Sequence, residues 1–181
     1  MAVKHRILLL GGRGQLGKVI LKSKQLKEIF SPNKKQLNIL NKKKIKEYIF
    51  SKKINLIINC AAKARMDYCE KFPNKAFKVN VDGVSNIVNA IKDTNIKFVH
   101  FSSDAVYGFN SINNREIDHP EPFNTYGLTK VCSEYFTKEL KNYIIIRTRL
   151  YISKKKYNSY AIDMVNSAIN INRIPKIIKI L

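Results

Sequence analysis

Hydrophobic residues occur in short continuous runs, separated by segments in which polar and apolar positions mix. A run of four to eight apolar residues is typical of a strand buried on both faces, as strands of parallel sheets are. Mostly apolar runs of this length occupy residues 3–10, 54–61, 97–102 and 143–147, and residues 28–31 are a shorter candidate. The pattern therefore predicts a mainly parallel sheet.

The segments between these runs predict helices at residues 15–26, 41–53 and 74–92, and another around residues 126–130. Strand and helix alternate with short connections, which implies right-handed crossovers. The predicted fold class is therefore α/β, with a doubly wound parallel sheet between two layers of helices. No repeat or interdomain linker is visible, so residues 1–181 form one domain. After Arg149 the pattern weakens, and we expect a further helix at 162–169 and a basic, apolar tail at 174–181.

Composition narrows the class of protein. Apolar residues make up 45% of the 181-residue chain and charged residues 26%, a globular balance. The cysteines (Cys60, Cys69 and Cys132) form no CxxC pair, which indicates packed, reduced thiols in a cytoplasmic protein and no metal site. The three histidines are scattered and are not expected to be site residues. The first apolar run is too short for a signal peptide or a membrane span.

A net charge of +21 could attract nucleic acid, anionic lipid or phosphorylated substrates. The lysines are spread along the chain, however, and no zinc finger or RNP-type aromatic motif accompanies them. We therefore interpret the charge as a compositional bias. Nucleic acid is not the expected partner.

Three glycines, Gly11, Gly14 and Gly17, stand between the first strand and the first helix. Glycine allows a tight turn and close approach of a pyrophosphate to the helix N-terminus. This context predicts a dinucleotide-binding fold of the Rossmann type. The segment 29–46 has no acidic residue to bind ribose hydroxyls, whereas Lys34 would suit a 2′-phosphate. NADPH is therefore the preferred cofactor, and NADH stays an alternative.

Tyr126 and Lys130 stand four residues apart, which places them on one face of a helix. We expect the ammonium to lower the pKa of the phenol, so that Tyr126 can donate a proton to a carbonyl oxygen. A chance pair is the alternative, but the glycine turn argues against it. Asp67 and Glu70 are interpreted as charges at a helix N-terminus, and Asn80 as a structural hydrogen-bonding residue.

Several ordered motifs over residues 3–151 resemble the extended short-chain dehydrogenase/reductase family, and within it the dTDP-4-dehydrorhamnose reductases of nucleotide-sugar metabolism. The turn at 14–17 reads GQLG, residues 59–62 read NCAA, and 100–108 read HFSSDAVYG. Residues 124–130 read NTYGLTK and 146–148 read IRT. Their order along the chain is more specific than any single motif.

The resemblance implies roles for the matching positions. Tyr126 would protonate the C4 carbonyl oxygen of a nucleotide-linked sugar, and Lys130 would also hold the nicotinamide ribose. Ser103 would hydrogen-bond the carbonyl oxygen or the tyrosine, and Asp104 would touch the sugar. The remaining cofactor contacts would come from Gly11, Gly14, Gln15, Leu16, Gly17, Lys34, Asn38, Ile39, Ala62, Lys63 and Ala64. The usual setting is polysaccharide biosynthesis, and the family implies a homodimer through the helices that hold Asn80 and Tyr126.

The match also has departures. The family is longer, so residues 152–181 would form only a short, truncated substrate region, and Leu150 stands where the family has an aromatic residue. The leading hypothesis is NADPH-dependent reduction of a nucleotide-linked 4-keto-6-deoxy sugar. A nucleotide-sugar epimerase or dehydratase, a non-catalytic NADP-binding regulatory subunit and a basic nucleic-acid-binding protein are the alternatives.

Overall fold

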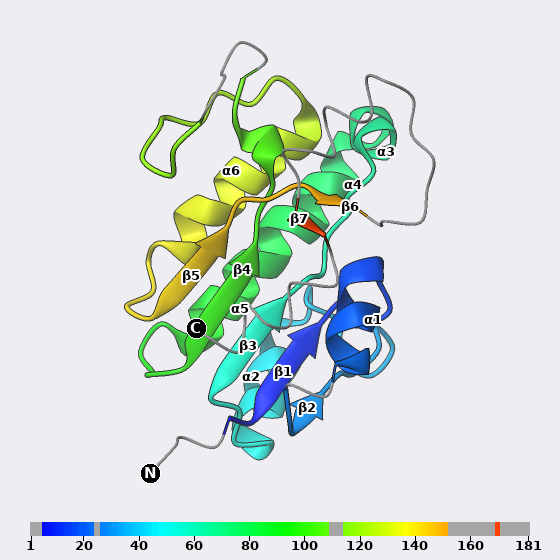
Figure 1. Cartoon of the computed structure of the whole chain (residues 1–181). Helices are drawn as coiled ribbons and strands as arrows, with labels where there is room; N and C mark the ends of the chain where they lie inside the picture. The colour runs from blue at the N-terminus through cyan, green and yellow to red at the C-terminus, as the bar shows by residue number, and fades with distance from the viewer. Residues whose placement is uncertain (1–4, 24–25, 109–113, 152–168, 171–181) are drawn as a thin grey trace.

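The computed structural model describes residues 5–23, 26–108, 114–151 and 169–170. Five parallel strands form one sheet in the order β2-β1-β3-β4-β5 (Figure 1). The strands are β1 (Ile7–Leu10), β2 (Ile29–Phe30), β3 (Leu56–Asn59), β4 (Lys97–Phe101) and β5 (Tyr143–Ile146). Short strands β6 (Leu150–Tyr151) and β7 (Ile169–Asn170) pair with each other in parallel. The predicted parallel α/β sheet is confirmed.

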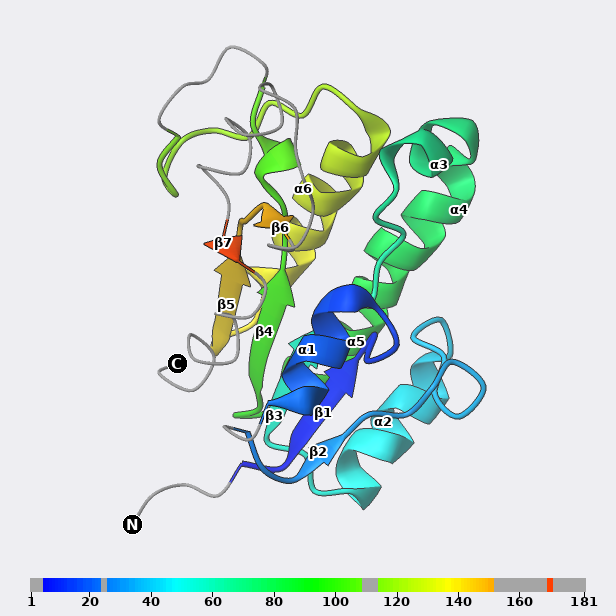
Figure 2. The ribbon, with the colours of Figure 1, turned by 45° about the vertical axis from the view of Figure 1, so that its right-hand side comes forward.

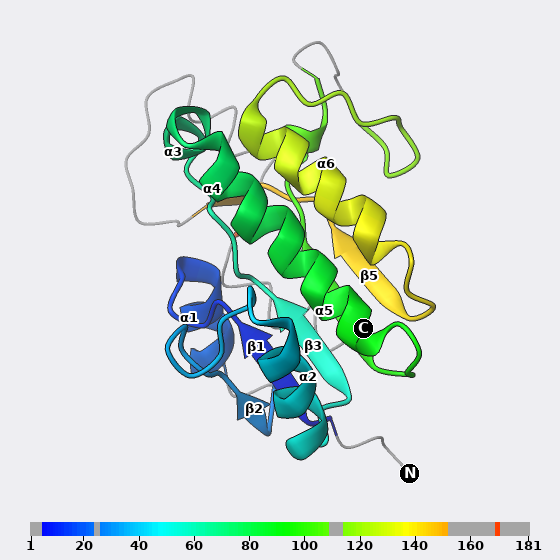
Figure 3. The same cartoon turned by 180° about the vertical axis from the view of Figure 1, so that it is seen from behind.

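Helices connect successive strands. They are α1 (Gln15–Lys22), α2 (Lys42–Ser51), α3 (Met66–Lys71), α4 (Pro73–Phe77), α5 (Gly83–Ile91) and α6 (Thr125–Thr137), with a π-helical turn at Lys78–Asp82 and a 3₁₀ turn at Asp104–Val106. Figure 2 shows α1 in front of the sheet, and Figure 3 shows α2, α5 and α6 on the opposite face. The sheet therefore lies between two helical layers, as the alternating pattern predicted.

Strand β1 shows why its residues form a central strand. Ile7 and Leu9 pack with Ile20 of α1 in one core cluster, whereas Leu8 and Leu10 belong to the cluster beneath α2 and α5. All four side chains of the strand are buried. Burying each is worth about 1.5–3 kcal/mol. Hydrophobic residues at every position thus fix β1 inside the sheet, between β2 and β3.

Two helix predictions need correction. The first helix ends at Lys22 and not at residue 26, because Ser23 is already extended and its N–H bonds the Ile20 carbonyl. The single helix expected at 74–92 contains a π-helical turn in its middle. That turn holds Asn80, whose amide must reach two other segments, as described below. Residues 162–168 and 174–181 lie outside the described residues, and Ile169 belongs to β7.

The order of the strands decides where a ligand can bind. The chain leaves β1 for β2 on one side of it and later returns to β3 on the other. At such a switch point the connections diverge and leave a crevice at the carboxyl ends of the strands. No helix in the described part of the chain is long and apolar enough to cross a membrane.

Candidate functional site

The turn after β1 is built around close backbone contacts. Gly11 has φ +80°, and a Cβ there would lie 2.6 Å from the Ala61 nitrogen. A Cβ at Gly17 would lie 2.4 Å from the Gly11 oxygen, so α1 packs directly on the turn. The Gly14 N–H closes the turn with a 2.9 Å hydrogen bond to the Gly11 carbonyl. Only glycine fits at Gly11 and Gly17 without displacing backbone.

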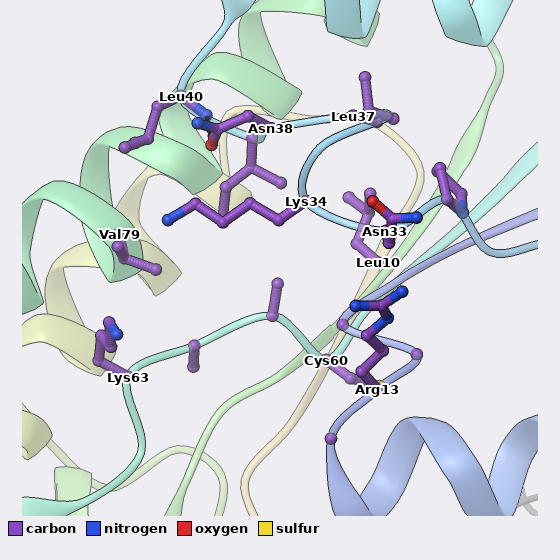
Figure 4. A pocket seen from close by; sticks show the side chains of 17 residues that line it. Leu10, Arg13, Asn33, Lys34, Leu37, Asn38, Leu40, Cys60, Lys63 and Val79 are labelled. Carbon is purple, nitrogen blue, oxygen red and sulfur yellow. Dashed lines mark hydrogen bonds between the residues drawn. The ribbon is translucent and has the colours of Figure 1, made fainter.

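A cavity of about 290 Å³ opens beside this turn, at the switch point between β1 and β3 (Figure 4). Three segments converge on it: the glycine turn, the loop after β2 and the loop after β3. Its lining residues are Leu10, Gly11, Gly12, Arg13, Gly14, Pro32, Asn33, Lys34, Leu37, Asn38, Ile39, Leu40, Cys60, Ala61, Ala62, Lys63 and Val79.

The charges around the cavity favour an anion. Arg13, Lys34 and Lys63 line it, and the described lining residues include no carboxylate. In Figure 4 the guanidinium of Arg13 is directed toward Asn33 in the loop after β2, and the Lys34 amine extends toward Val79. The first turn of α1 has no side-chain cap, so its N–H groups are available to a ligand. The residues present therefore fit the phosphates of a dinucleotide.

The sequence predicted part of this lining. Seven of the predicted cofactor residues line the cavity: Gly11, Gly14, Lys34, Asn38, Ile39, Ala62 and Lys63. The others, Gln15, Leu16, Gly17, Ala64, Tyr126 and Lys130, are not among its lining residues. Arg13 was missed, although its place inside the glycine turn was a usable signal.

Asn80 joins this cavity to helix α6. Its Oδ1 accepts from the Lys63 N–H at 2.7 Å, and its Nδ2 donates to the Lys63 carbonyl at 3.0 Å and to Thr129 Oγ1 at 2.9 Å. Asn80 is 1% exposed. The predicted structural role of this residue is confirmed. The π-helical turn provides the position from which one amide reaches both segments.

A second group of side chains lies at the carboxyl end of β4. Ser103 follows that strand, and its Oγ accepts from the Ala105 N–H at 3.1 Å. Tyr126 lies in the first turn of α6, whose N-cap Asn124 accepts from the Gly127 N–H at 2.7 Å. A Cβ at Gly127 would lie 2.1 Å from the Ala105 oxygen. This close contact lets the start of α6 approach the loop after β4.

Glu70 anchors the start of α6. Its two carboxylate oxygens accept from the Thr125 N–H at 2.7 Å and from Thr125 Oγ1 at 2.8 Å. A negative charge at a helix N-terminus is stabilising. Glu70 is therefore a charge at a helix N-terminus, as predicted, and the helix concerned is α6. Asp67 lies in the first turn of α3.

The pKa of Tyr126 differs from the sequence-based expectation. Burial raises it, the hydrogen bond with the Ser103 side chain opposes this, and the charge of Asp104 raises it further. Lys130 is not among the causes of the shift. The expectation that Lys130 lowers the pKa of Tyr126 is therefore wrong for this structure, in which the Lys130 amine donates to the Phe101 carbonyl. Ser103, by contrast, is brought to the tyrosine.

Lys130 is 2% exposed and lies against β4. Its Nζ donates to the Phe101 carbonyl at 2.6 Å and lies 3.4 Å from His100 Nε2. Burial lowers its pKa to about 8, and the charges of Glu134 and Cys60 act in the opposite direction. The lysine is thus a buried amine whose charge is easily lost.

A buried ion pair lies behind this group and was not predicted. The Arg147 guanidinium donates to both carboxylate oxygens of Glu134, at 2.7 Å for the shortest contact, and to the Tyr107 hydroxyl at 2.9 Å. Ser102 Oγ also donates to Glu134. Asp104, the predicted sugar contact, forms an ion pair with Arg149. Glu134 carried no sequence signal because it stands among ordinary helix residues.

Comparison with known proteins agrees with this geometry. A family model described as "RmlD substrate binding domain" matches residues 5–177. The chain belongs to this family. A dTDP-4-dehydrorhamnose reductase from Aggregatibacter actinomycetemcomitans is 34% identical over 148 residues, which are 79% of this chain and 50% of that protein.

Two further proteins are similar to this chain. Methionine adenosyltransferase 2 subunit beta from Bos taurus is 30% identical over 139 residues, 72% of this chain and 42% of that protein. The crystal structure of dTDP-4-dehydrorhamnose reductase from Bacillus anthracis in complex with NADP superposes with a TM-score of 0.78 and 31% identity. The match covers 92% of this chain and 60% of that one. The chain thus spans about half the length of the curated relatives it matches.

Proposed function

We propose that this chain is the dinucleotide-binding part of an NADPH-dependent reductase of a nucleotide-linked 4-keto-6-deoxy sugar. One observation carries the proposal. A cation-lined cavity at the switch point of the sheet lies at the same carboxyl edge as the hydrogen-bonded pair Ser103 and Tyr126. A dinucleotide site and a proton donor on one edge suit carbonyl reduction.

The cavity supports NADPH as the cofactor. Arg13, Lys34 and Lys63 provide three positive charges without a carboxylate among the described lining residues. A 2′-phosphate is stabilised by such cations, whereas the ribose hydroxyls of NADH are usually bound by an acid. The relative from Bacillus anthracis was solved with NADP. NADH remains the alternative that a binding measurement separates.

The roles of the side chains follow from their surroundings. The reduced nicotinamide, when bound, supplies a hydride to the carbonyl carbon. Tyr126 gives its proton to the carbonyl oxygen, and its raised pKa keeps it protonated and ready at neutral pH. Ser103 hydrogen-bonds that oxygen or orients the tyrosine. Lys130, whose pKa is about 8, is largely charged at neutral pH, and we assign it to the nicotinamide ribose, the other role that the resemblance implies.

The structure describes only some of the residues that are proposed to bind the sugar. Asp104, whose charge acts on Tyr126, and its ion-pair partner Arg149 are the proposed contacts to the sugar. Homodimerisation through the helices that hold Asn80 and Tyr126, and a cytoplasmic setting in polysaccharide biosynthesis, belong to the same proposal.

The variant Tyr126→Phe tests the reaction. It removes the proton donor and keeps the ring, so the dissociation constant for NADPH should stay within about twofold while turnover falls at least about a hundredfold. NADPH oxidation in the presence of nucleotide-linked 4-keto sugars measures this. Unchanged turnover in Tyr126→Phe would refute the role of the tyrosine.

A non-catalytic NADP-binding regulatory subunit is the second candidate. The position of Lys130 favours it: the amine is hydrogen-bonded to the Phe101 carbonyl, and its charge does not contribute to the shift in the Tyr126 pKa. A sequence similarity to methionine adenosyltransferase 2 subunit beta also supports it. Saturable NADPH binding without oxidation by any keto sugar, together with co-purification of a larger enzyme, would favour this candidate over the reductase.

A further inference from the structure

Asn59 and His100 occupy paired positions at the carboxyl ends of β3 and β4. Their exposed fractions are 1% and 0%. Fully buried polar side chains on central strands are uncommon and are almost always hydrogen-bonded. The proposed reaction assigns neither residue a role.

The backbone of the cavity loop fixes the orientation of the Asn59 amide. The Ala61 N–H donates to Asn59 Oδ1 at 3.1 Å, so the Nδ2 amide group faces His100 Nδ1 at 3.2 Å. An amide N–H is a donor only, and Nδ1 must therefore present a lone pair. A neutral imidazole with its lone pair on Nδ1 carries its proton on Nε2.

The opposite side of the ring leads to the same tautomer. Ser133 Oγ donates to the Lys130 carbonyl at 2.7 Å, which uses the single hydroxyl proton. The same oxygen lies 2.9 Å from His100 Nε2 and must accept a proton from it. Burial and the charge of Lys130 lower the pKa of His100 well below its usual value, so the ring is neutral. Two independent contacts thus place one proton on Nε2.

This proton affects the ammonium of Lys130. Nζ lies 3.4 Å from His100 Nε2, which bears a hydrogen and cannot accept. Among the described residues, the Phe101 carbonyl at 2.6 Å is then the acceptor that holds the amine. An ammonium has three hydrogens, so the other two stay available. Besides His100, the titratable groups that face Lys130 are Glu134 on its own helix and Cys60 after β3, a thiol whose pKa burial raises to about 12.

We propose that Asn59 is a positioning residue. By holding the proton of His100 on Nε2, it denies Lys130 an acceptor there and leaves the ammonium hydrogens for the reacting groups. The catalytic consequence rests on the proposed function, but the arrangement of protons does not. The chain of contacts runs from the cavity loop at Ala61 through Asn59, His100 and Ser133 to helix α6.

The isosteric variant Asn59→Asp tests the proposal. Its carboxylate still accepts from the Ala61 N–H but requires a donor at His100 Nδ1. The proton therefore moves to Nδ1, the hydrogen bond from Nε2 to Ser133 Oγ is lost, and Nε2 becomes an acceptor for Lys130. Nitrogen-15 NMR of the imidazole should show Nε2–H in the wild type and Nδ1–H in the variant. Carbon-13 NMR of the lysine ε-carbons should show the Lys130 pKa rising from about 8 to above about 9.

Controls separate the tautomer from the added charge. The signal of Lys130 is assigned by its loss in Lys130→Met. In the double variant Asn59→Asp/His100→Phe, the added carboxylate remains but the imidazole acceptor is removed. The pKa of Lys130 should then rise less than in Asn59→Asp alone. His119→Phe makes the same substitution at an exposed histidine and should leave the Lys130 pKa unchanged.

These NMR measurements do not depend on turnover, so failure of this proposal can be distinguished from failure of the proposed function. A wild-type proton on Nδ1 would overturn the proposal even if no variant folds. An unchanged Lys130 pKa in Asn59→Asp, or a rise that persists in full in the double variant, would also overturn it. A chain that shows the expected protons but binds no dinucleotide would refute the reductase and leave this proposal standing. In an active enzyme the alkaline limb of the pH profile should move upward with the Lys130 pKa.

Discussion

The ammonium nitrogen of Lys130 lies 2.6 Å from the carbonyl oxygen of Phe101, so strand β4 holds the lysine that the sequence paired with Tyr126. Lys130 is 2% exposed, whereas Tyr126 is half-buried. Helical spacing correctly placed both residues on α6. The Lys130 charge nevertheless does not contribute to the shift in the Tyr126 pKa, because the amine is directed toward β4.

The stability of the protein should rise as the pH increases from about 8 to 10.5, the pKa values of Lys130 in the folded protein and of an ordinary lysine. In that window the unfolded lysine binds a proton and the folded one does not, so higher pH favours folding, by up to about 3 kcal/mol. Urea unfolding of the wild type and Lys130→Met over this range measures the effect. Parallel pH dependences in the two proteins would contradict it.

Glu134→Gln should lower the free energy of unfolding by about 3–5 kcal/mol, because it leaves the buried Arg147 guanidinium without its counter-charge. The side chains of this pair are 2% and 11% exposed. The matched control is Asp118→Asn in the exposed Arg115–Asp118 pair, where the expected loss is below about 1 kcal/mol. Equal losses of unfolding free energy in the two variants would show that the buried ion pair contributes no more to stability than the exposed one.

Gly11→Ala should destabilise the fold by about 1–3 kcal/mol and abolish NADPH binding, since φ is +80° and a Cβ would lie 2.6 Å from backbone. Gly14→Ala is the control within the same turn, because its φ is −70° and the nearest atom would lie at 3.3 Å. Thermal unfolding and fluorescence titration measure both effects. Binding that survives in Gly11→Ala would place the dinucleotide elsewhere.

Arg13→Gln should weaken NADPH binding about tenfold, or about 1.4 kcal/mol, with a smaller effect on NADH. The reason is the direction of the guanidinium, toward the loop after β2, where the adenosine ribose of a dinucleotide lies (Figure 4). Lys18→Gln removes the same charge from the exposed side of α1 and should change neither affinity by more than about twofold. An equal loss for both cofactors would assign Arg13 to the pyrophosphate.

Much of the fold was predictable because its signals are local. Apolar runs identified the strands, and helical spacing identified α2 and α6. The glycine turn was predictable for the same reason, since its contacts lie within residues 11–17 and on the neighbouring loop after β3.

The missing parts depend on contacts between distant segments. Asn59 and His100 are 41 positions apart, and only the register of β3 and β4 makes them neighbours. The π-helical turn around Asn80 serves partners at Lys63 and Thr129, which no helical pattern reveals. A polar residue inside an otherwise apolar strand was the available signal for His100.

The most direct test of the proposed cofactor site is a titration of the purified chain with NADPH and with NADH, followed by the fluorescence of the reduced nicotinamide. We expect saturable binding of one equivalent, tighter for NADPH, lost in Gly11→Ala and retained in Tyr126→Phe. No saturable binding of either dinucleotide would contradict the assignment of the cavity between β1 and β3, and with it the proposed reductase.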